Sequence, residues 1–158
     1  MSVKKPRPFT AREEHIGTAV IGVMSKLNTW IYRASGGRLA GRFWGGAPVL
    51  LLTTVGRKSG ARRTAPLLYL EDGDRYVVVA SKGGMSHHPS WFKNLEANPE
   101  VEVEVGSRTM AMTARQATQV EKAALWPRLV AMYHSYDDYQ ARTTRDIPVV
   151  LLTPRQRS

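Results

Sequence analysis

Cysteine is absent from this sequence of 158 residues. Its absence excludes disulfides, thiolate zinc sites, iron–sulfur clusters and a cysteine nucleophile. Long apolar runs are also missing, so we expect neither a membrane-spanning helix, which needs about 18 such residues, nor a signal peptide. The length is that of one ordinary domain. We therefore expect a single-domain cytoplasmic protein.

Negative charge is scarce, and one long stretch has none. The chain has 23 Lys and Arg against 13 Asp and Glu, a net charge of +10, and no carboxylate lies between Glu14 and Glu71. That stretch holds Lys26, Arg33, Arg38, Arg42, Arg57, Lys58, Arg62 and Arg63. Such one-sided charge indicates an anionic partner, either a phosphorylated ligand, nucleic acid or an acidic membrane. A solvated basic surface would have the same composition.

The N-terminal region predicts a flexible basic tail over residues 1–11, followed by an amphipathic helix over 12–34 within one domain of residues 12–158. Apolar residues at three- and four-residue spacings share one face of this helix: Ile16, Val20, Val23, Leu27, Trp30 and Ile31. Packing over the core is the commoner role for such a face. The alternative is contact with an anionic membrane surface.

Beyond the helix, short apolar or alternating runs predict six strands, over residues 48–55, 64–71, 75–81, 101–105, 109–114 and 147–153. Asp72-Gly73 predicts a hairpin between the second and third strands. Short helices are expected over about 89–97 and after the capping-box pair Thr118 and Glu121. Strands and helices do not alternate, so we expect an α+β, mostly β, fold: a small antiparallel barrel with peripheral helices.

The basic turn at residues 56–64 is the first candidate site. It carries four cations, two between Gly56 and Gly60 and two after Gly60. The glycines let backbone N–H groups approach an anion, and Ser59 or Thr64 can add a hydroxyl donor. Arginine gives forked bonds to phosphate or carboxylate, and lysine a mobile charge. The turn predicts an anion-binding loop, although an exposed basic hairpin would contain the same residues. Residues 36–43 have Walker-A spacing without its Lys and Ser/Thr.

Two further segments combine polar and aromatic residues. Residues 80–95 run from a strand end through Gly83-Gly84 to a helix start, where N–H groups can bind an anion and Trp91 offers a flat surface. Tyrosines recur at spacing three, at 133, 136 and 139, which predicts neighbouring positions on a helix. They could form an apolar wall with hydroxyl donors for a flat ligand. Ordinary turn chemistry and core packing remain alternatives.

Together these segments resemble the deazaflavin-dependent nitroreductase family, small split β-barrel proteins of actinomycetes that bind coenzyme F-420. The resemblance covers about residues 40–154. It rests on Thr-Thr-x-Gly-Arg-Lys-Ser-Gly-x-x-Arg from Thr53, followed by Ala-Ser-Lys-Gly-Gly and His-Pro-x-Trp-x-x-Asn-Leu. The sequence departs from the family at Met85-Ser86 and at Phe92, near the mouth of the expected groove. These departures bear on the substrate more than on the cofactor.

The resemblance implies a site for coenzyme F-420, an 8-hydroxy-5-deazaflavin with a phosphate and an oligoglutamate tail, and no metal. The cofactor-binding residues it implies are Arg57, Lys58, Ser59 and Arg63 for phosphate and tail, and Thr64, Pro66, Leu67, Ala80, Ser81, Lys82, Gly83, Trp91 and Asn94 around ring and groove. The implied substrate side consists of Tyr133, Tyr136 and Tyr139. Tyr136 and Ser81 are the candidate catalytic donors of a hydrogen bond or proton.

The function this resemblance implies is hydride transfer from reduced coenzyme F-420 to a quinone, enone or nitroaromatic acceptor. An FMN-using split-barrel oxidoreductase is one alternative. A non-enzymatic basic nucleic-acid-binding module is another, although no DNA- or RNA-binding signature is present and nucleic acid is not the expected partner. For the first helix we predict weak, salt-reversible association with an anionic membrane, which would suit a lipid-soluble quinone met at the inner face of the cell membrane.

Overall fold

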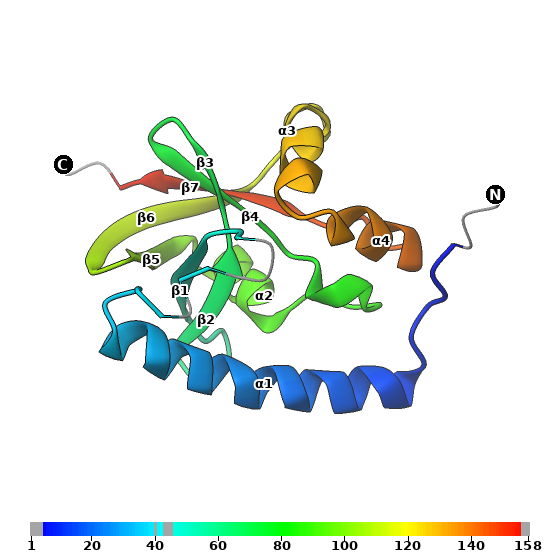
Figure 1. Ribbon diagram of the computed structural model, residues 1–158, viewed down its shortest axis with the longest axis horizontal. Coiled ribbons are helices and arrows are strands. Elements are labelled where there is room, and N and C mark those ends of the chain that lie inside the picture. The colour runs from blue at the N-terminus through cyan, green and yellow to red at the C-terminus, as the bar shows by residue number, and fades with distance from the viewer. Residues whose placement is uncertain (1–4, 40, 43–45, 156–158) are drawn as a thin grey trace.

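The computed structural model describes residues 5–39, 41–42 and 46–155. Seven strands form one antiparallel sheet in the order β2-β1-β5-β6-β7-β4-β3 (Figure 1). The strands are β1 (Val49–Val55), β2 (Arg62–Leu68), β3 (Leu70–Asp72), β4 (Arg75–Val79), β5 (Glu100–Val105), β6 (Arg108–Gln116) and β7 (Val149–Pro154). The mostly β, antiparallel barrel architecture expected from the sequence is confirmed.

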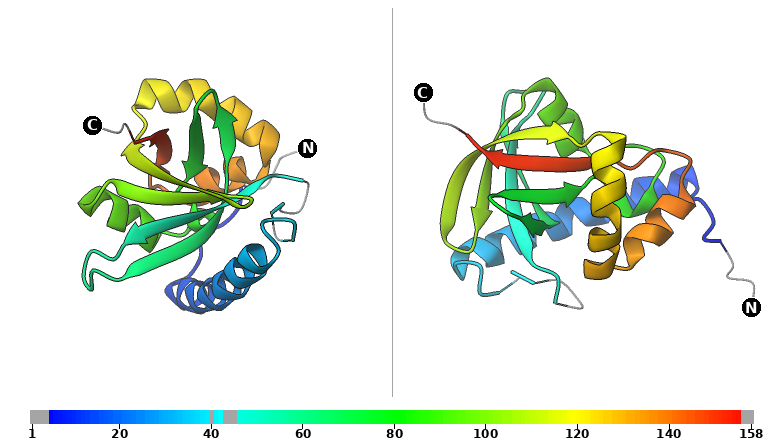
Figure 2. Two further views of the ribbon diagram at one scale, coloured as in Figure 1. Left: turned by 90° about the vertical axis from the view of Figure 1, so that its left-hand side faces the viewer. Right: turned by 90° about the horizontal axis from the view of Figure 1, so that it is seen from above.

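The sheet curls because two strands that follow each other in the chain lie at its opposite edges. Only Tyr69 separates β2 from β3, yet these strands end the sheet on either side. The expected single strand over 64–71 is therefore wrong: β2 pairs with β1 as far as Leu68, and Leu70 starts a new pairing with Val77 of β4. This short link joins the two edges, so the sheet forms a curled half-barrel (Figure 2). The hairpin predicted at Asp72-Gly73 is confirmed between β3 and β4.

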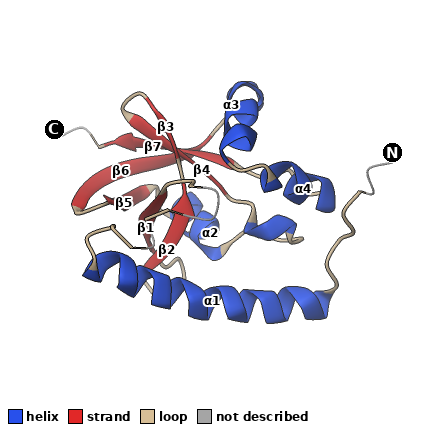
Figure 3. Cartoon of the chain, viewed as in Figure 1, coloured by secondary structure: helices blue, strands red, loops and turns tan. Residues whose placement is uncertain are grey.

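Both faces of the central strands are buried, which explains the continuous apolar runs in β1 and β7. Alternate residues of a strand point to opposite faces. Leu152 belongs to a core cluster packed under α2 (Ser90–Ala97), whereas its neighbour Leu151 belongs to a second cluster packed under α3 (Gln119–Met132) and α4 (Ser135–Arg142). The helices thus cover the two sides of the sheet (Figure 3).

The start of α3 is confirmed, but the expected arrangement of the three tyrosines on one helix is wrong. Thr118 caps α3 through the capping box with Glu121. Tyr133 is the C-cap of α3, and only Tyr136 and Tyr139 lie in α4. The rings nevertheless remain in contact across the break, with centroids 5.0 Å apart for Tyr133 and Tyr136.

The N-terminal helix α1 (Ala11–Ala34) forms over the expected residues, but its apolar face does not cover the core. Five side chains of that face are between 51% and 70% exposed: Ile16, Val20, Val23, Leu27 and Trp30. Small and polar side chains occupy the opposite face. The core-packing interpretation of the apolar face is therefore wrong. Residues 1–4 of the predicted tail lie outside the described residues, and Arg7 forms an ion pair with Glu13.

Each end of α1 is attached to the rest of the fold by polar contacts. Near its N-terminus the buried carboxylate of Glu14 accepts hydrogen bonds from Ser86 N at 2.6 Å and Ser86 Oγ at 2.7 Å. Near its C-terminus the buried Tyr32 hydroxyl accepts a hydrogen bond from Gly106 N at 2.7 Å, and Arg33 pairs with Glu104 at 2.8 Å. Between these attachments α1 runs alongside β2, as Figure 1 shows.

Candidate functional site

The candidate site is a groove between α1 and β2 that contains two adjoining cavities. The basic cavity has a volume of about 590 Å³ and the tyrosine cavity about 530 Å³; Ile21 and Ser25 of α1 line both. The basic cavity is lined by Arg57, Lys58, Ser59, Arg63, Thr64, Lys82, Trp91 and Asn94 among the predicted residues. The tyrosine cavity is lined by Pro66, Leu67, Ser81, Tyr133, Tyr136 and Tyr139.

The basic turn that follows β1 is closed by its own backbone. Gly56 N donates to Ala61 O at 2.7 Å, and Gly60 N donates to Gly56 O at 2.8 Å. A Cβ at Gly56 would lie 2.9 Å from Ser59 Oγ and 3.0 Å from Ala61 O, so a larger residue would force the turn open. The tight turn leaves the side chains of Arg57 and Lys58 exposed at the mouth of the basic cavity.

Asn94 fixes the basic turn to α2 and β1. Its side chain is buried; Oδ1 accepts hydrogen bonds from Arg57 N at 3.2 Å and Arg57 Nη1 at 3.0 Å, and Nδ2 donates to Thr54 Oγ1 at 3.2 Å. Asn94 therefore orients Arg57, besides lining the cavity. Through these bonds one buried amide joins the strand, the turn and the helix.

Three cations of the basic cavity differ in how they are paired. Within the described part of the chain, Lys58 and Arg63 have no partner. Lys82 lies 2.7 Å from His87 Nε2, and burial lowers the pKa of its ammonium. An ammonium only donates, so Nε2 of His87 accepts and its proton sits on Nδ1, which lies 3.4 Å from Glu14 Oε2. Lys82 is thus connected to the N-terminal attachment of α1.

The end of β4 is held by Arg145, a residue that the sequence analysis did not identify. Its guanidinium donates to Ala80 O at 3.0 Å, Ser81 O at 2.7 Å and Met85 O at 3.1 Å. These bonds fix the turn 82–84 in a left-handed backbone, with Lys82 at φ +43°. The turn is also packed against α4, because a Cβ on Gly84 would lie 2.5 Å from Tyr139 O.

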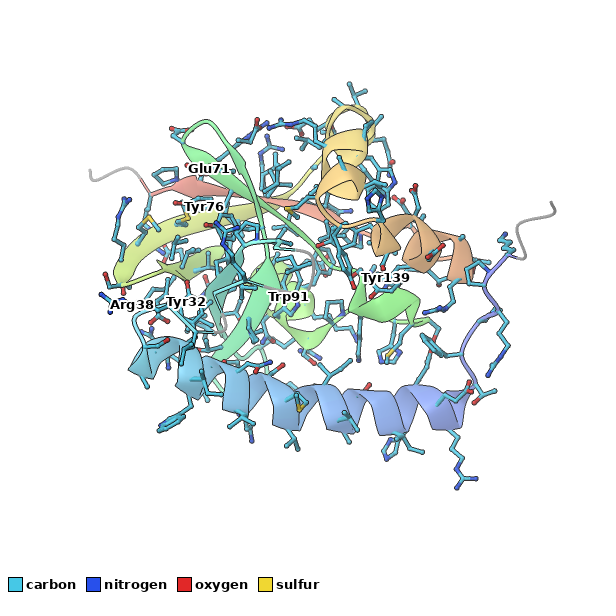
Figure 4. The ribbon with its side chains drawn as sticks, in the orientation of Figure 1. Tyr32, Arg38, Glu71, Tyr76, Trp91 and Tyr139 are labelled. Carbon is cyan, nitrogen blue, oxygen red and sulfur yellow. The ribbon has the colours of Figure 1, made fainter. Side chains whose placement is uncertain are left out.

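The tyrosine cavity combines an apolar wall with hydroxyl groups. Tyr136 is buried, and the hydroxyls of Tyr133 and Tyr139 lie 2.9 Å apart. Burial raises the pKa of Tyr136 and of Tyr139 well above their usual value. Both therefore stay protonated at neutral pH and can donate hydrogen bonds, but they are poor proton donors. Figure 4 shows Tyr139 and Trp91 on the side of the groove opposite α1.

Two of the predicted residues line neither cavity. Ala80 is fully buried in the core, and the carbonyl oxygen of Gly83 accepts a hydrogen bond from Arg142 at 2.9 Å. The α1 side of the groove was not predicted from the sequence. It is formed by Thr18, Ile21, Gly22, Met24, Ser25, Lys26 and Asn28. The signal for most of it was present in the sequence: small and polar residues recur on the face opposite the apolar one.

Comparisons with known proteins show the family of this chain. The family model described as F420H(2)-dependent quinone reductase matches residues 24–154. The chain belongs to the F420H(2)-dependent quinone reductase family. An F420H(2)-dependent quinone reductase of Mycobacterium tuberculosis is 43% identical over 147 residues, which cover 90% of this chain and 95% of that protein.

Solved structures place the family on this fold. The structure described as "F420-H2 Dependent Reductase (FDR-A)" has 42% sequence identity and a TM-score of 0.62, covering 66% of this chain and 93% of that chain. A second, described as a domain-swapped dimer, has 32% identity and a TM-score of 0.65, covering 90% of this chain and 99% of that one. The family resemblance inferred from the sequence motifs is confirmed.

Proposed function

We propose that this protein reduces quinones with hydride from reduced coenzyme F-420, held in the groove between α1 and β2. The observation that carries the proposal is the pair of adjoining cavities in a chain of this family. One cavity has unpaired cations suited to a phosphate and an acidic tail. The other has an apolar, tyrosine-lined wall suited to a flat ring system and a flat acceptor. The residues present therefore fit this cofactor.

The basic cavity supplies the anchoring contacts in this proposal. Lys58 and Arg63 have no carboxylate partner in the described residues, so they can pair with anions of the cofactor without breaking an existing bond. Arg57 is oriented by Asn94 at the same mouth. A unit charge pair about 4 Å apart at an effective dielectric of about 20 interacts by about 4 kcal/mol before desolvation. Two or three such contacts would dominate the binding of the cofactor's phosphate.

The tyrosine cavity would place the quinone against the ring. When bound, the reduced deazaflavin supplies a hydride, and the protein has to keep the reacting atoms within about 3–3.5 Å. Pro66 and Leu67 of β2 line this cavity and would support the ring, whereas Tyr136 and Ser81, which line it too, would donate hydrogen bonds to the developing oxyanion. Because the pKa of Tyr136 is raised, this donor role suits it better than proton transfer, and solvent supplies the proton.

The absorbance of the purified protein distinguishes the proposal from its alternatives. A retained deazaflavin absorbs near the violet, a flavin in the blue and nucleic acid in the ultraviolet. We expect added coenzyme F-420 to bind, and its reduced form to be oxidised when a naphthoquinone is added. Tight binding of FMN or nucleic acid, without binding of coenzyme F-420, would contradict the proposal.

We further propose that the outward face of α1 contacts an anionic membrane surface at the cytoplasmic side. Five apolar side chains on that face are more than half exposed: Ile16, Val20, Val23, Leu27 and Trp30. Each cation near an anionic bilayer contributes about 1 kcal/mol to the free energy of membrane binding. At that surface the protein would also meet a lipid-soluble quinone. In the described residues no helix is long and apolar enough to cross a membrane, so the proposed contact is peripheral.

Co-sedimentation with anionic vesicles tests the membrane contact. The intact protein should bind weakly at low salt and dissociate at high salt. The triple variant Val20→Ser, Val23→Ser, Leu27→Ser should lose binding, because it removes outward apolar area and changes none of the residues that line the cavities between α1 and β2. This variant is cleaner than deleting residues 1–34, which would also remove the buried Tyr32. Absence of binding by the intact protein, or dimerisation through the same face, would contradict the proposal.

A further inference from the structure

The N-terminal end of α1 is attached to the segment that contains Lys82. Glu14 accepts two hydrogen bonds from Ser86, and Met85 packs against Gly17, where an added Cβ would lie 2.8 Å from Met85 Cε. Met85 and Ser86 are positions at which the sequence departs from the family pattern. In the structure, both of them hold α1.

A second set of contacts joins this attachment to the basic cavity. Lys82 lines the cavity, and its ammonium donates to His87 Nε2 at 2.7 Å. Nδ1 of His87, which carries the ring proton, lies 3.4 Å from Glu14 Oε2. Glu14, His87 and Lys82 thus form one polar network. Only Lys82 faces the groove, because Glu14 and His87 line neither of its two cavities.

The acceptor for the Lys82 ammonium is a neutral imidazole rather than a carboxylate. In the described residues Lys82 forms no ion pair, so no partner neutralises its positive charge. The imidazole can therefore hold the ammonium in one position and leave its charge available to an anion in the cavity. An ammonium has three protons, of which the bond to His87 uses one. Lys58, by contrast, carries a charge that no side chain holds in place.

The backbone at Lys82 adopts a conformation that lysine rarely takes. Its φ is +43°, in the left-handed region that favours glycine. Such a backbone persists only where the surrounding structure imposes it, and it is common at ligand-binding sites. Here Arg145 imposes it through the carbonyl oxygens of the neighbouring residues, and His87 holds the side chain. Both the backbone and the side chain of Lys82 are therefore fixed.

We infer that Glu14 and His87 are positioning residues for Lys82, and that they couple the binding of the cofactor to the attachment of α1. The inference rests on the proposed function, in which an anionic group of the cofactor occupies the basic cavity. When α1 is attached, Glu14 faces the Nδ1 proton of His87, so Nε2 is free to accept and Lys82 is held for the anion. Coupling is reciprocal, so an anion bound at Lys82 also stabilises the attached end of α1.

The first test measures dissociation constants of coenzyme F-420 for variants of His87, by fluorescence titration at about pH 8, where imidazole is neutral. His87→Leu removes the acceptor without a change of charge. Affinity should fall about threefold to tenfold, because the lysine side chain must then be immobilised on binding. His87→Gln keeps an acceptor and should restore affinity to within about twofold of the native value. His15→Leu, the same substitution at an exposed position of α1, is the matched control and should have no effect.

A double-mutant cycle shows whether the effect of His87 passes through Lys82. Lys82→Met removes the ammonium that His87 holds. In the Lys82→Met background, the further change His87→Leu should alter affinity by less than about twofold. Equal losses in the two backgrounds would mean that His87 acts independently of Lys82, which would overturn the inference.

Glu14→Gln gives a result whose sign separates this network from simple electrostatics. The loss of a carboxylate near an anion site should by itself strengthen the binding of an anion. A glutamine amide, however, cannot accept from the backbone and hydroxyl of Ser86 and also face the Nδ1 proton of His87 with an oxygen. We therefore expect affinity to fall by about threefold. Glu96→Gln, which removes an exposed carboxylate from α2, is the control and should not weaken binding. Stronger binding by Glu14→Gln would contradict the inference.

Hydrogen exchange tests the coupling without any turnover. Saturating coenzyme F-420 should raise the protection of the amides of residues 14–17 about threefold or more in the native protein, although none of these residues lines a cavity of the groove. The increase should be lost in His87→Leu. If the native protein binds no coenzyme F-420, the proposed function fails. If it binds, and His87→Leu keeps the native affinity or the full increase in protection, the proposed function stands and this inference is overturned.

Discussion

The two walls of the groove are built in different ways. On the sheet side, the segments that line the groove are fixed by partly buried hydrogen bonds: Asn94 holds the basic turn and Arg145 holds the end of β4. On the other side, α1 is attached at its two ends, through Glu14 and Ser86 and through Arg33 and Glu104. The side chains on the sheet wall are therefore already held in one orientation, whereas α1 closes the groove and is attached at its two ends.

The orientation of α1 shows what an amphipathic pattern does and does not establish. The pattern correctly predicts two different faces, and burial of the apolar one is the usual expectation. Here the groove requires small and polar residues, so Gly22 and Ser25 face inward and Val23 and Leu27 face solvent. A helix that lines a ligand cavity can present its polar face to the protein.

The largest effect of breaking the sheet wall is expected from Arg145→Met. The variant removes the guanidinium donor from three carbonyl oxygens and from His88 Nδ1; of these carbonyls, Ser81 O keeps the hydrogen bond from Gly84 N. Hydrogen bonds to charged groups contribute about 1.5–3 kcal/mol, so the free energy of unfolding should fall by about 3 kcal/mol. Urea denaturation measures it. Arg142→Met is the control. It loses one hydrogen bond to Gly83 O and the contact of its guanidinium with the Phe9 ring, so it should cost about 1–2 kcal/mol. Equal losses in the two variants would refute the central role of Arg145.

The double variant Lys58→Ala, Arg63→Ala tests the positive charges on the sheet wall of the groove. Both side chains are exposed and unpaired in the described residues, so folding should not depend on them. Cofactor affinity should fall about tenfold at low salt. The loss should be smaller at high salt, because charges are screened over about 8–10 Å at physiological ionic strength. Fluorescence titration at two salt concentrations measures both. Unchanged affinity would exclude the basic turn as the anchor.

A smaller and more selective effect is expected from Tyr136→Phe. Only the hydroxyl is removed from a buried ring, so cofactor affinity should stay within about twofold. Turnover of the bound cofactor with a naphthoquinone should fall by about fivefold, because a donor to the developing oxyanion is lost. Single-turnover kinetics separate the two quantities. Loss of cofactor affinity with unchanged turnover would reverse our assignment of the cofactor and substrate sides.

The attachment of α1 should give the smallest effect, and it should depend on pH. Hydrogen bonds from Ser86, first its backbone N–H, hold the pKa of Glu14 below its ordinary value of 4.5. A carboxyl with a lowered pKa stabilises the fold above that value, and the contribution is lost as the pH falls below it. The protection of the amides in the first two turns of α1, measured as the intrinsic exchange rate at each pH divided by the observed rate, should therefore fall between about pH 5 and pH 3.

In the variant Glu14→Gln, the amides in the first two turns of α1 should be less protected from exchange already at neutral pH. Their protection should also depend less on pH than in the native protein. Glu96→Gln serves as the control, because Glu96 is exposed on α2 and has no hydrogen bond or ion pair in the described residues. Lys82 and His87 face Glu14 and are unchanged in both variants. Equal pH profiles in the native protein and in Glu14→Gln would mean that this carboxylate does not hold the helix.

The sequence predicted the sheet wall better than the helix wall, for physical reasons. The basic turn and the strand ends are set by local glycines and by strand periodicity, so their residues could be identified directly. The break between β2 and β3 at Tyr69 could not be predicted from the sequence, because it depends on which strands meet at the two edges of the sheet. Arg145 could not either: an arginine in a loop carries no local pattern, and its carbonyl partners at 80 and 81 are distant in sequence.

The central claim is that the cofactor lies between α1 and β2, and Gly22→Leu tests it most directly. Gly22 lines the basic cavity, and no atom lies within 4 Å of a Cβ added there. Leucine is favoured over glycine in a helix by about 0.8–1 kcal/mol, so the fold should not be destabilised. Ala19→Leu is the control, because Ala19 is exposed and outside both cavities. The account predicts that the dissociation constant of coenzyme F-420 rises at least about tenfold in Gly22→Leu alone; unchanged affinity in a folded Gly22→Leu protein would contradict it.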